Sequence, residues 1–244
     1  EQIFPIENKH VINVAKGIER NTLMRVSEIL QDVTEIKQEN YIVLTGPSHA
    51  EEVALQSPTT VVAASANPSL AESVQQIFSN DYFRVYTSND VTGCEMGGSL
   101  KNVIAIAAGI VDGMEIGDNT KAAIITRGLA EISRLGTAIG ANHLTFSGLS
   151  GLGDLFVTCN SRHSRNRNVG ELIGKGMTLP EIQRKTKKIA EGVFTTESAY
   201  QLGKKHDVEM PIAEQISEIL FNHKPPVAAI KDLMNRQTKH EKWW

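Results

Sequence analysis

The pattern of hydrophobic residues changes near residue 90, and this change most constrains the fold. Before it, short apolar runs alternate with helical patterns, and after it helical periodicity continues with almost no β-branched alternation. Strands that alternate with helices predict an α/β sheet. We therefore expect an α/β part over 1–90 and an all-α, helical part over 91–244. The expected strands are 10–15, 41–44, 60–65 and 83–86, and the helices between them are 21–32, with Asn21 as its N-cap, and 71–78.

The second part is expected to consist of helices packed around one buried helix. The segment Leu100 to Val111 is apolar on nearly all sides, which predicts a helix inside the core. The long segment 120–139 places Ala, Ile and Leu on one face, and charged residues, among them Glu131, interrupt it. Further helices are expected at 179–186, 196–204, 212–221 and 227–234.

Composition excludes several classes of protein. The 244 residues are 41% hydrophobic and 22% charged, which is ordinary for a globular protein and sufficient for a large core. With 25 basic and 28 acidic residues the net charge is −3, so a nucleic-acid partner is not expected. The longest mainly apolar stretch, Val103 to Val111, falls far short of the roughly 20 residues that span a bilayer, so membrane insertion is not expected either.

Cysteine and histidine usage gives two further expectations. Cys94 and Cys159 form no CxxC pair, which favours reduced thiols and a cytoplasmic location. The seven histidines are scattered without ligand spacing, so no metal site is expected. The N-terminus lacks Met and resembles no targeting segment, which indicates a truncated or processed chain.

Lys101 is the most informative single residue. Its neighbours on the helical wheel include Ile104, Ala105 and Ala108, inside the helix that is expected to be buried. A buried ammonium group loses hydration, which lowers its pKa toward neutrality and suits general acid–base catalysis. The alternative is that Lys101 lies in the first turn of the helix and extends to the surface.

A glycine-rich loop, Gly148 to Asp154, ends in a carboxylate. Its spacing, GxxGxGD, differs from the GxGxxG of dinucleotide-binding folds, but it can bring Asp154 close to a ligand or to Lys101. Thr158 follows one helical turn later. The alternative is that Asp154 only caps a helix that begins at Leu155.

Polar segments elsewhere could bind an anion. Ser161 to Arg167 contains three arginines, whose guanidinium groups suit a phosphate or a carboxylate, although a solvated loop is the alternative. Two strands end in Lys16-Gly17 and in Gly46-Pro47-Ser48, at the edge where open α/β sheets bind ligands. From composition alone, plain turns are the favoured interpretation of both segments.

Taken together, these segments resemble the bacterial type of NAD(P)-dependent glycerol-3-phosphate dehydrogenase. The resemblance implies that residues 1–90 form the second half of a Rossmann-like NAD(P)-binding domain, followed by a helical substrate domain. It also implies that the chain is N-terminally truncated, because the family's GxGxxG loop is not in it. The matching stretches are NVAKGIE (13–19), LTGPSHAEEVA (44–54), GGSLKNVIAIAAGI (97–110), GDNTKAAIITRGLAEISRLG (117–136), GLSGLGDLFVTCNSRHSRNR (148–167) and AEGVFTT (190–196).

The resemblance also implies roles for single residues. Lys101 would be the catalytic proton donor and acceptor with Asn102 beside it, and Asp154 would bind the glyceryl group and tune Lys101, with Thr158 in support. The remaining substrate-binding residues would be Lys16, Gly46, Ser48, Ser164, Arg165 and Asn166. The residues that contact the nicotinamide cofactor would be Lys16, Ala50, Arg165, Ile189 and Glu191.

The function that the resemblance implies is the reversible reduction of dihydroxyacetone phosphate by NADH or NADPH, which supplies glycerophospholipid synthesis. A related dehydrogenase of the 3-hydroxyacyl or phosphogluconate type is one alternative, but those families are not expected to carry the GLGDL and HSRNR segments. The other alternative is a non-catalytic helical module that binds a substrate or a partner. The sequence leaves the choice of NAD or NADP open, and also the oligomeric state, for which a homodimer is one option.

Overall fold

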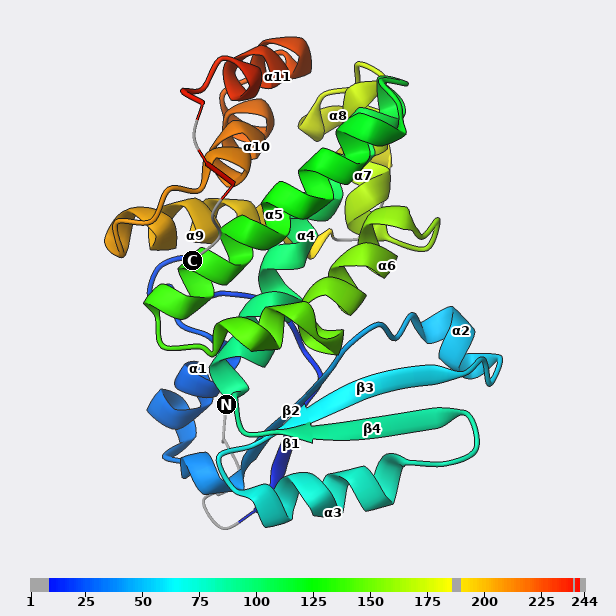
Figure 1. Cartoon of the computed structure of the whole chain (residues 1–244), viewed down its shortest axis with the longest axis vertical. Coiled ribbons are helices and arrows are strands. Elements are labelled where there is room, and N and C mark those ends of the chain that lie inside the picture. The colour runs from blue at the N-terminus through cyan, green and yellow to red at the C-terminus, as the bar shows by residue number, and fades with distance from the viewer. Residues whose placement is uncertain (1–8, 186–189, 239, 242–244) are drawn as a thin grey trace.

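The computed structural model describes residues 9–185, 190–238 and 240–241. A four-stranded sheet lies at one end of the protein and a body of helices lies above it (Figure 1). The strand order is β1-β2-β3-β4; β1 and β2 are parallel, β2 and β3 antiparallel, and β3 and β4 parallel. The expected α/β part followed by helices is confirmed, with a mixed sheet. The strands are β1 (Val11–Asn13), β2 (Tyr41–Thr45), β3 (Thr59–Ala64) and β4 (Phe83–Ser88).

Helix α3 (Pro68–Phe78) covers one face of this sheet (Figure 1). Leu70 and Val74 of α3 pack against Ile42, Val61 and Val85 of the strands. The helix begins three residues before the predicted position, because the Asn67 side chain accepts a hydrogen bond from the Leu70 amide and caps it. On the other face of the sheet, strand residues pack against Cys94.

Helix α1 (Val26–Thr34) corrects the expected helix at 21–32. Asn21 is not the N-cap; Arg25 takes that position, and the Glu28 carboxylate accepts a hydrogen bond from the Arg25 amide. The preceding residues form a turn because the Glu19 carboxylate accepts hydrogen bonds from the amides of Asn21 and Thr22. This local competition for backbone donors delays the start of the helix.

The central element is helix α4 (Val91–Gly113), which contains and extends the buried helix expected at 100–111. Its close contact with α7 (Arg165–Gly174) depends on glycine: a Cβ on Gly109 would overlap the backbone carbonyl of Arg167, and one on Gly170 would overlap that of Ile106. Among the described residues, α4 is the one helix long and apolar enough to cross a membrane. Its apolar window is entirely buried within the protein, as in the core helix of a soluble protein.

The other helices surround α4 or extend the body away from the sheet (Figure 1). The predicted helices at 120–139, 196–204, 212–221 and 227–234 are confirmed within a few residues, and so is the helix at 179–186 up to Lys185, since Thr186 lies outside the described residues. Helices α2 and α7 were not predicted, and a helix at the position of α6 was considered as one that begins at Leu155. The bounds are α2 (Ala50–Ala54), α5 (Asp118–Ala138), α6 (Asp154–Asn160), α8 (Leu179–Lys185), α9 (Glu191–Lys205), α10 (Pro211–Phe221) and α11 (Pro226–Met234), with short helical turns η1 (Gln38–Asn40), η2 (His143–Ser147) and η3 (Leu149–Gly153).

Candidate functional site

A polar pocket of about 230 Å³ lies between the carboxyl ends of β1 and β2 and helices α4, α6, α7 and α9. Most of the predicted site residues line it. Gly46 and Ala50 do not line this pocket, and Ile189 lies outside the described residues. The predicted residues that line the pocket are Lys16, Ser48, Lys101, Asn102, Asp154, Thr158, Ser164, Arg165, Asn166 and Glu191.

A buried lysine–carboxylate pair forms the floor of the pocket. Lys101, 6% exposed, lies in the middle of α4 and donates hydrogen bonds to Asp154 Oδ1 and, at 2.7 Å, to Thr158 Oγ1. The alternative that Lys101 extends to the surface from a first turn is therefore wrong. The other Asp154 oxygen accepts a hydrogen bond from Lys16 Nζ at 2.7 Å, so one carboxylate, 1% exposed, holds two ammonium groups.

Helix α6 explains why Asp154 and Thr158 meet Lys101 together. Asp154 is the first residue of α6, and the N-cap position belongs to Gly153, so the alternative of a carboxylate that only caps the helix is wrong. Thr158, one turn later, donates its hydroxyl hydrogen to the Asp154 carbonyl at 2.6 Å. The short helix thus directs both side chains toward the same ammonium group.

The surroundings of Lys101 lower the pKa of its ammonium group to about 8. Burial is the largest cause, because it penalises the charged form, and the neighbouring Lys16 acts in the same direction. Asp154 opposes both effects by favouring the charged form. A lysine with this pKa can both release and take up a proton near neutral pH, as general acid–base catalysis requires.

The arginine-rich segment 161–167 is divided between a turn and a helix: Ser161 to Ser164 precede α7, and residues 165–167 form its first turn. Ser164 caps the helix by accepting a hydrogen bond from the Arg167 amide at 3.2 Å. Arg165 is half-exposed at the pocket, with its guanidinium 3.7 Å from the Glu191 carboxylate. The side-chain oxygen of Asn166 accepts a hydrogen bond from the Gly192 amide at 2.9 Å, which joins α7 to the start of α9. A helix N-terminus with an arginine beside it favours an anion.

Arg167, the last arginine of this segment, has a different role. It does not line the pocket, and its guanidinium pairs instead with Asp112 at 2.6 Å and Glu171 at 3.3 Å. Its charge is therefore used to hold α7 against the end of α4. Three arginines in seven residues consequently do not act as one anion-binding cluster.

Two histidines in the pocket were not singled out from the sequence. His49 and His163 both line it, and their ring centroids are 6.1 Å apart. Burial and the nearby Lys101 lower the pKa of His49, which favours its neutral imidazole form. The sequence signal that could have indicated these histidines is their position beside predicted site residues: His49 follows Ser48 directly, and His163 precedes Ser164.

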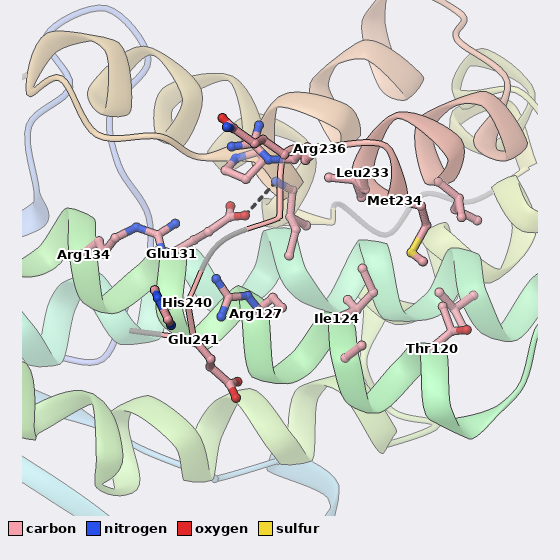
Figure 2. Close-up of a pocket in the computed structure, with 16 residues that line it drawn as sticks. Thr120, Ile124, Arg127, Glu131, Arg134, Leu233, Met234, Arg236, His240 and Glu241 are labelled. Atoms are coloured by element: carbon pink, nitrogen blue, oxygen red, sulfur yellow. Dashed lines mark hydrogen bonds between the residues drawn. The ribbon is translucent and has the colours of Figure 1, made fainter. Parts of the chain in front are cut away.

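A second cavity, of about 370 Å³, lies far along the helical body between α5, α10 and α11 (Figure 2). It shares no lining residue with the Lys101 pocket. Glu131 points from α5 toward the start of α10 and accepts hydrogen bonds from the amides of Ile212 and Ala213, at 2.8 and 3.3 Å. Burial raises the pKa of Glu131 to about 7. Within the described residues, no group of three or more His, Cys, Asp or Glu side chains could hold a metal ion.

A Rossmann-like sheet that ends at a pocket with a buried lysine fits the class of nicotinamide-dependent oxidoreductases. The family described as NAD-dependent glycerol-3-phosphate dehydrogenase matches over most of the chain, with its N-terminal part on residues 2–71 and its C-terminal part on residues 90–231. The chain belongs to this family, and the resemblance inferred from its motifs is confirmed.

Individual relatives agree with this membership. A glycerol-3-phosphate dehydrogenase [NAD(P)+] of Chlorobium chlorochromatii is 56% identical over 240 residues, which are 98% of this chain and 72% of that protein. The enzyme of that name from Bacillus subtilis is 54% identical, over 94% of this chain and 67% of its own length. The crystal structure of glycerol-3-phosphate dehydrogenase from Coxiella burnetii superposes with a TM-score of 0.87 at 37% identity, over 92% of this chain and 68% of that one.

Proposed function

We propose that the protein carrying this chain interconverts dihydroxyacetone phosphate and sn-glycerol 3-phosphate with NAD(P)H or NAD(P)+. The observation that carries the proposal is the buried Lys101–Asp154 pair, which lies in one polar pocket with Arg165 at the start of α7. Family membership supports the same reaction. We further propose that the product supplies glycerophospholipid synthesis in the cytoplasm.

Lys101 is assigned as the general acid and base. When dihydroxyacetone phosphate is reduced, the Lys101 ammonium group donates a proton to the carbonyl oxygen of the substrate. In the reverse direction the Lys101 amine takes that proton from the substrate hydroxyl. Asp154 and Thr158 hold the nitrogen in place through their hydrogen bonds to it. Asn102, the next residue of α4, lines the same pocket and is assigned beside Lys101.

The residues at the strand ends fit a nicotinamide cofactor. The carboxyl ends of the parallel strands β1 and β2 open onto the pocket, which is the edge where open α/β sheets bind such groups. The bound cofactor supplies the hydride. Lys16, Arg165 and Glu191 line the pocket and are assigned to contact it. Ala50, exposed at the start of α2, and Ile189 remain predictions from the resemblance.

Substrate binding is assigned to both sides of the pocket. Ser164, Arg165 and Asn166 would hold the phosphate, because two charge-assisted hydrogen bonds from one guanidinium fix both position and orientation. Lys16 and Ser48 would complete the pocket from the side of the sheet, and Gly46 would act by shaping the turn after β2, where its φ of +145° favours glycine. Holding the phosphate fixes where the carbonyl lies relative to Lys101.

The wider organisation follows from the same proposal. We assign residues 1–90 to the cofactor-binding part and residues 91–244 to the substrate-binding part. A homodimer is the proposed oligomeric state, and light scattering of the purified protein tests it.

The test of the proposal is a rate assay with a matched pair of arginine variants. Arg165→Lys keeps the charge but loses the planar fork, so KM for dihydroxyacetone phosphate should rise by about ten- to a hundredfold, and KM for the cofactor should change less. Arg162→Lys, an exposed residue outside the pocket, should change neither value.

Unphosphorylated dihydroxyacetone is the control substrate, and its turnover should be nearly indifferent to Arg165→Lys. If both substrates lose the same factor, Arg165 does not bind the phosphate. If NADH and NADPH are not oxidised in the presence of dihydroxyacetone phosphate, the proposed reaction is wrong.

A further inference from the structure

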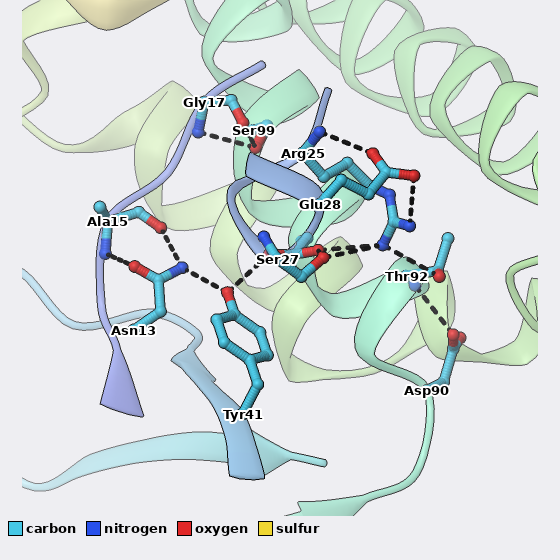
Figure 3. Close-up of polar contacts among 12 residues, drawn as sticks. Asn13, Ala15, Gly17, Arg25, Ser27, Glu28, Tyr41, Asp90, Thr92 and Ser99 are labelled. Atoms are coloured by element: carbon cyan, nitrogen blue, oxygen red, sulfur yellow. Dashed lines mark hydrogen bonds and ion pairs between the residues drawn. The ribbon is translucent and has the colours of Figure 1, made fainter. Parts of the chain in front are cut away.

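A continuous set of hydrogen-bonded polar side chains lies behind the pocket, where β1, β2, α1 and α4 meet (Figure 3). Four of its members are buried and the fifth, Arg25, is partly buried. Burial of this many polar groups is costly unless each finds its partners, so the arrangement has to be precise. The members are Asn13, Arg25, Ser27, Tyr41 and Glu95.

Glu95 of α4 anchors this network. Its Oε1 accepts hydrogen bonds from the Tyr41 hydroxyl at 2.7 Å and from the Ser27 amide at 2.9 Å. Its Oε2 accepts hydrogen bonds from the Ser27 hydroxyl at 2.6 Å and from Arg25 Nη1 at 3.0 Å. Both carboxylate oxygens are thus satisfied, and the Tyr41 hydroxyl is oriented as a donor toward α4. Burial and Glu95 raise the pKa of Tyr41, which keeps this hydroxyl protonated.

The network continues from Tyr41 to the segment that carries Lys16. The Tyr41 oxygen accepts a hydrogen bond from Asn13 Nδ2 at 2.8 Å. The same Asn13 amide group donates to the Ala15 carbonyl at 3.1 Å and accepts from the Ala15 amide at 2.9 Å (Figure 3). One residue beyond Lys16, the Gly17 amide donates to Ser99 Oγ at 2.9 Å. The backbone is therefore fixed on both sides of Lys16.

Fixing this backbone matters because Lys16 has a long, rotatable side chain. Ordering such a side chain costs conformational entropy, and less is lost when the backbone from which the side chain extends is already fixed. Its ammonium nitrogen lies 2.7 Å from Asp154 Oδ2, on the carboxylate that also holds Lys101. The conformation of residues 13–17 thus sets the origin from which the Lys16 side chain reaches Asp154.

We infer that Tyr41 is a positioning residue of this site: through Asn13 it fixes the segment that places Lys16 on Asp154 opposite Lys101. Tyr41 does not line the pocket, so it acts on Lys16 through Asn13 and not by direct contact. Glu95 and Lys101 both belong to α4. The network therefore ties the position of Lys16 to the helix that carries the catalytic lysine.

The expected consequence is a change in the acidity of Lys101. Lys16 is the charged group near Lys101 that the network controls, and its positive charge disfavours the ammonium form of Lys101. If Lys16 leaves Asp154, the pKa of Lys101 should therefore rise. The charged or titratable groups that face Lys101 or line its pocket are Asp154, Lys16, His49, His163, Arg165 and Glu191.

The test uses Tyr41→Phe, which deletes one hydroxyl, and measures the pKa of Lys101 by NMR of protein labelled with ε-¹³C lysine. Lys101→Arg assigns the signal, and Lys16→Met defines the full shift, which should be upward by roughly half a unit or more for the loss of one nearby charge. Tyr41→Phe should reproduce most of that shift. The matched control is Tyr200→Phe, which removes another tyrosine–glutamate hydrogen bond, 3.3 Å long and joining α9 to α10, and should leave Lys101 unchanged.

Asn13→Ala provides a second variant should Tyr41→Phe fail to fold, because it breaks the same connection nearer the pocket and leaves Tyr41 bound to Glu95. The inference is overturned if Lys16→Met shifts the pKa of Lys101 but neither Tyr41→Phe nor Asn13→Ala does. It is equally overturned if Lys16→Met causes no shift.

The inference deepens the proposed function and rests on it for one further readout. The pH profile of kcat/KM for dihydroxyacetone phosphate should move to higher pH in Tyr41→Phe and stay in place in Tyr200→Phe. If the wild-type protein does not reduce dihydroxyacetone phosphate, the proposed function fails while the NMR titration still decides the role of Tyr41.

Discussion

Two buried carboxylates, Asp154 and Glu131, lie in similar isolation from water and have different partners. Asp154 is 1% exposed and Glu131 is 2% exposed. Asp154 binds the ammonium groups of Lys16 and Lys101, whereas Glu131 accepts two backbone N–H groups at the start of α10. The same chemical group thus holds two lysine side chains in one place and joins two helices in the other.

The two regions also differ in which side chain has a shifted pKa, Glu131 in one and Lys101 in the other. At Glu131 burial outweighs the hydrogen bonds from two neutral amides, so the carboxyl itself has a pKa raised to about 7. Beside Asp154, the pKa of Lys101 is lowered to about 8 because its own burial, together with the charge of Lys16, outweighs the opposing effect of the carboxylate. Each region therefore holds one buried titratable group, Glu131 or Lys101, whose pKa is shifted toward neutrality mainly by its own burial.

The largest expected effect is on kcat, which should depend on the region around Asp154 and not on the region around Glu131. Lys101→Ala should lower kcat by about 10²- to 10⁴-fold, the usual contribution of a general acid–base group, and leave cofactor binding nearly intact. Glu131→Ala should leave kcat near the wild-type value, because the second cavity shares no residue with the pocket. Steady-state oxidation of NADH and a cofactor titration measure both. A near-normal kcat in Lys101→Ala would end its assigned role.

The next effect separates the two regions by the pH dependence of stability. The folded-state pKa of Glu131 is raised above its ordinary value of 4.5, so the folded protein binds more protons than the unfolded chain between pH 4.5 and about 7. The free energy of unfolding should therefore fall as pH rises through this window, by about 3 kcal/mol from this group.

Glu131→Gln cannot ionise and should lose this contribution. Urea unfolding of the wild type and of Glu131→Gln at pH 5 and pH 7.5 measures the difference between their slopes. Parallel pH dependence in the two proteins would show that Glu131 is ionised in the folded state over the whole range.

The smallest expected effect is local and concerns the start of α10. Glu131→Gln leaves one acceptor oxygen for two amides, so one hydrogen bond worth about 1 kcal/mol should be lost. Amide hydrogen exchange at Ile212 or Ala213 should then become about five- to tenfold faster. The Gly93 amide, which is held by the Asp90 carboxylate at the start of α4, is the internal control. Equal acceleration at Gly93 would indicate general destabilisation instead.

The sequence predicted the Asp154 region better than the Glu131 region, for a physical reason. The apolar periodicity around Lys101 indicated its burial, and the glycine-rich loop indicated a close approach of Asp154. Glu131 resembled any other charged interruption of a long helix, because its partners come from α10, which follows it by some 80 residues. Contacts between such distant segments leave no local pattern.

Strand direction and short polar helices could not be predicted from local sequence patterns either, because both depend on contacts between distant segments. The antiparallel pairing of β2 and β3 depends on where the intervening chain turns, and four correctly placed apolar runs do not determine it. Helix α7 begins with the polar run Arg-Asn-Arg-Asn and is stabilised by packing on α4, so no apolar period marks its first turn. The family resemblance alone placed Lys16 in the same site as Asp154, 138 residues away, and their ion pair was not predicted.

The contact of α4 with α7 through Gly109 and Gly170 fixes the relative position of two residues of the proposed site. Lys101 is fixed to one helix and Arg165 to the other, and the two helices touch backbone to backbone with no flexible side chain between them. The distance between the two backbone positions from which Lys101 and Arg165 extend is thereby set by direct packing of the two helices. A Cβ at either glycine would force these two positions apart.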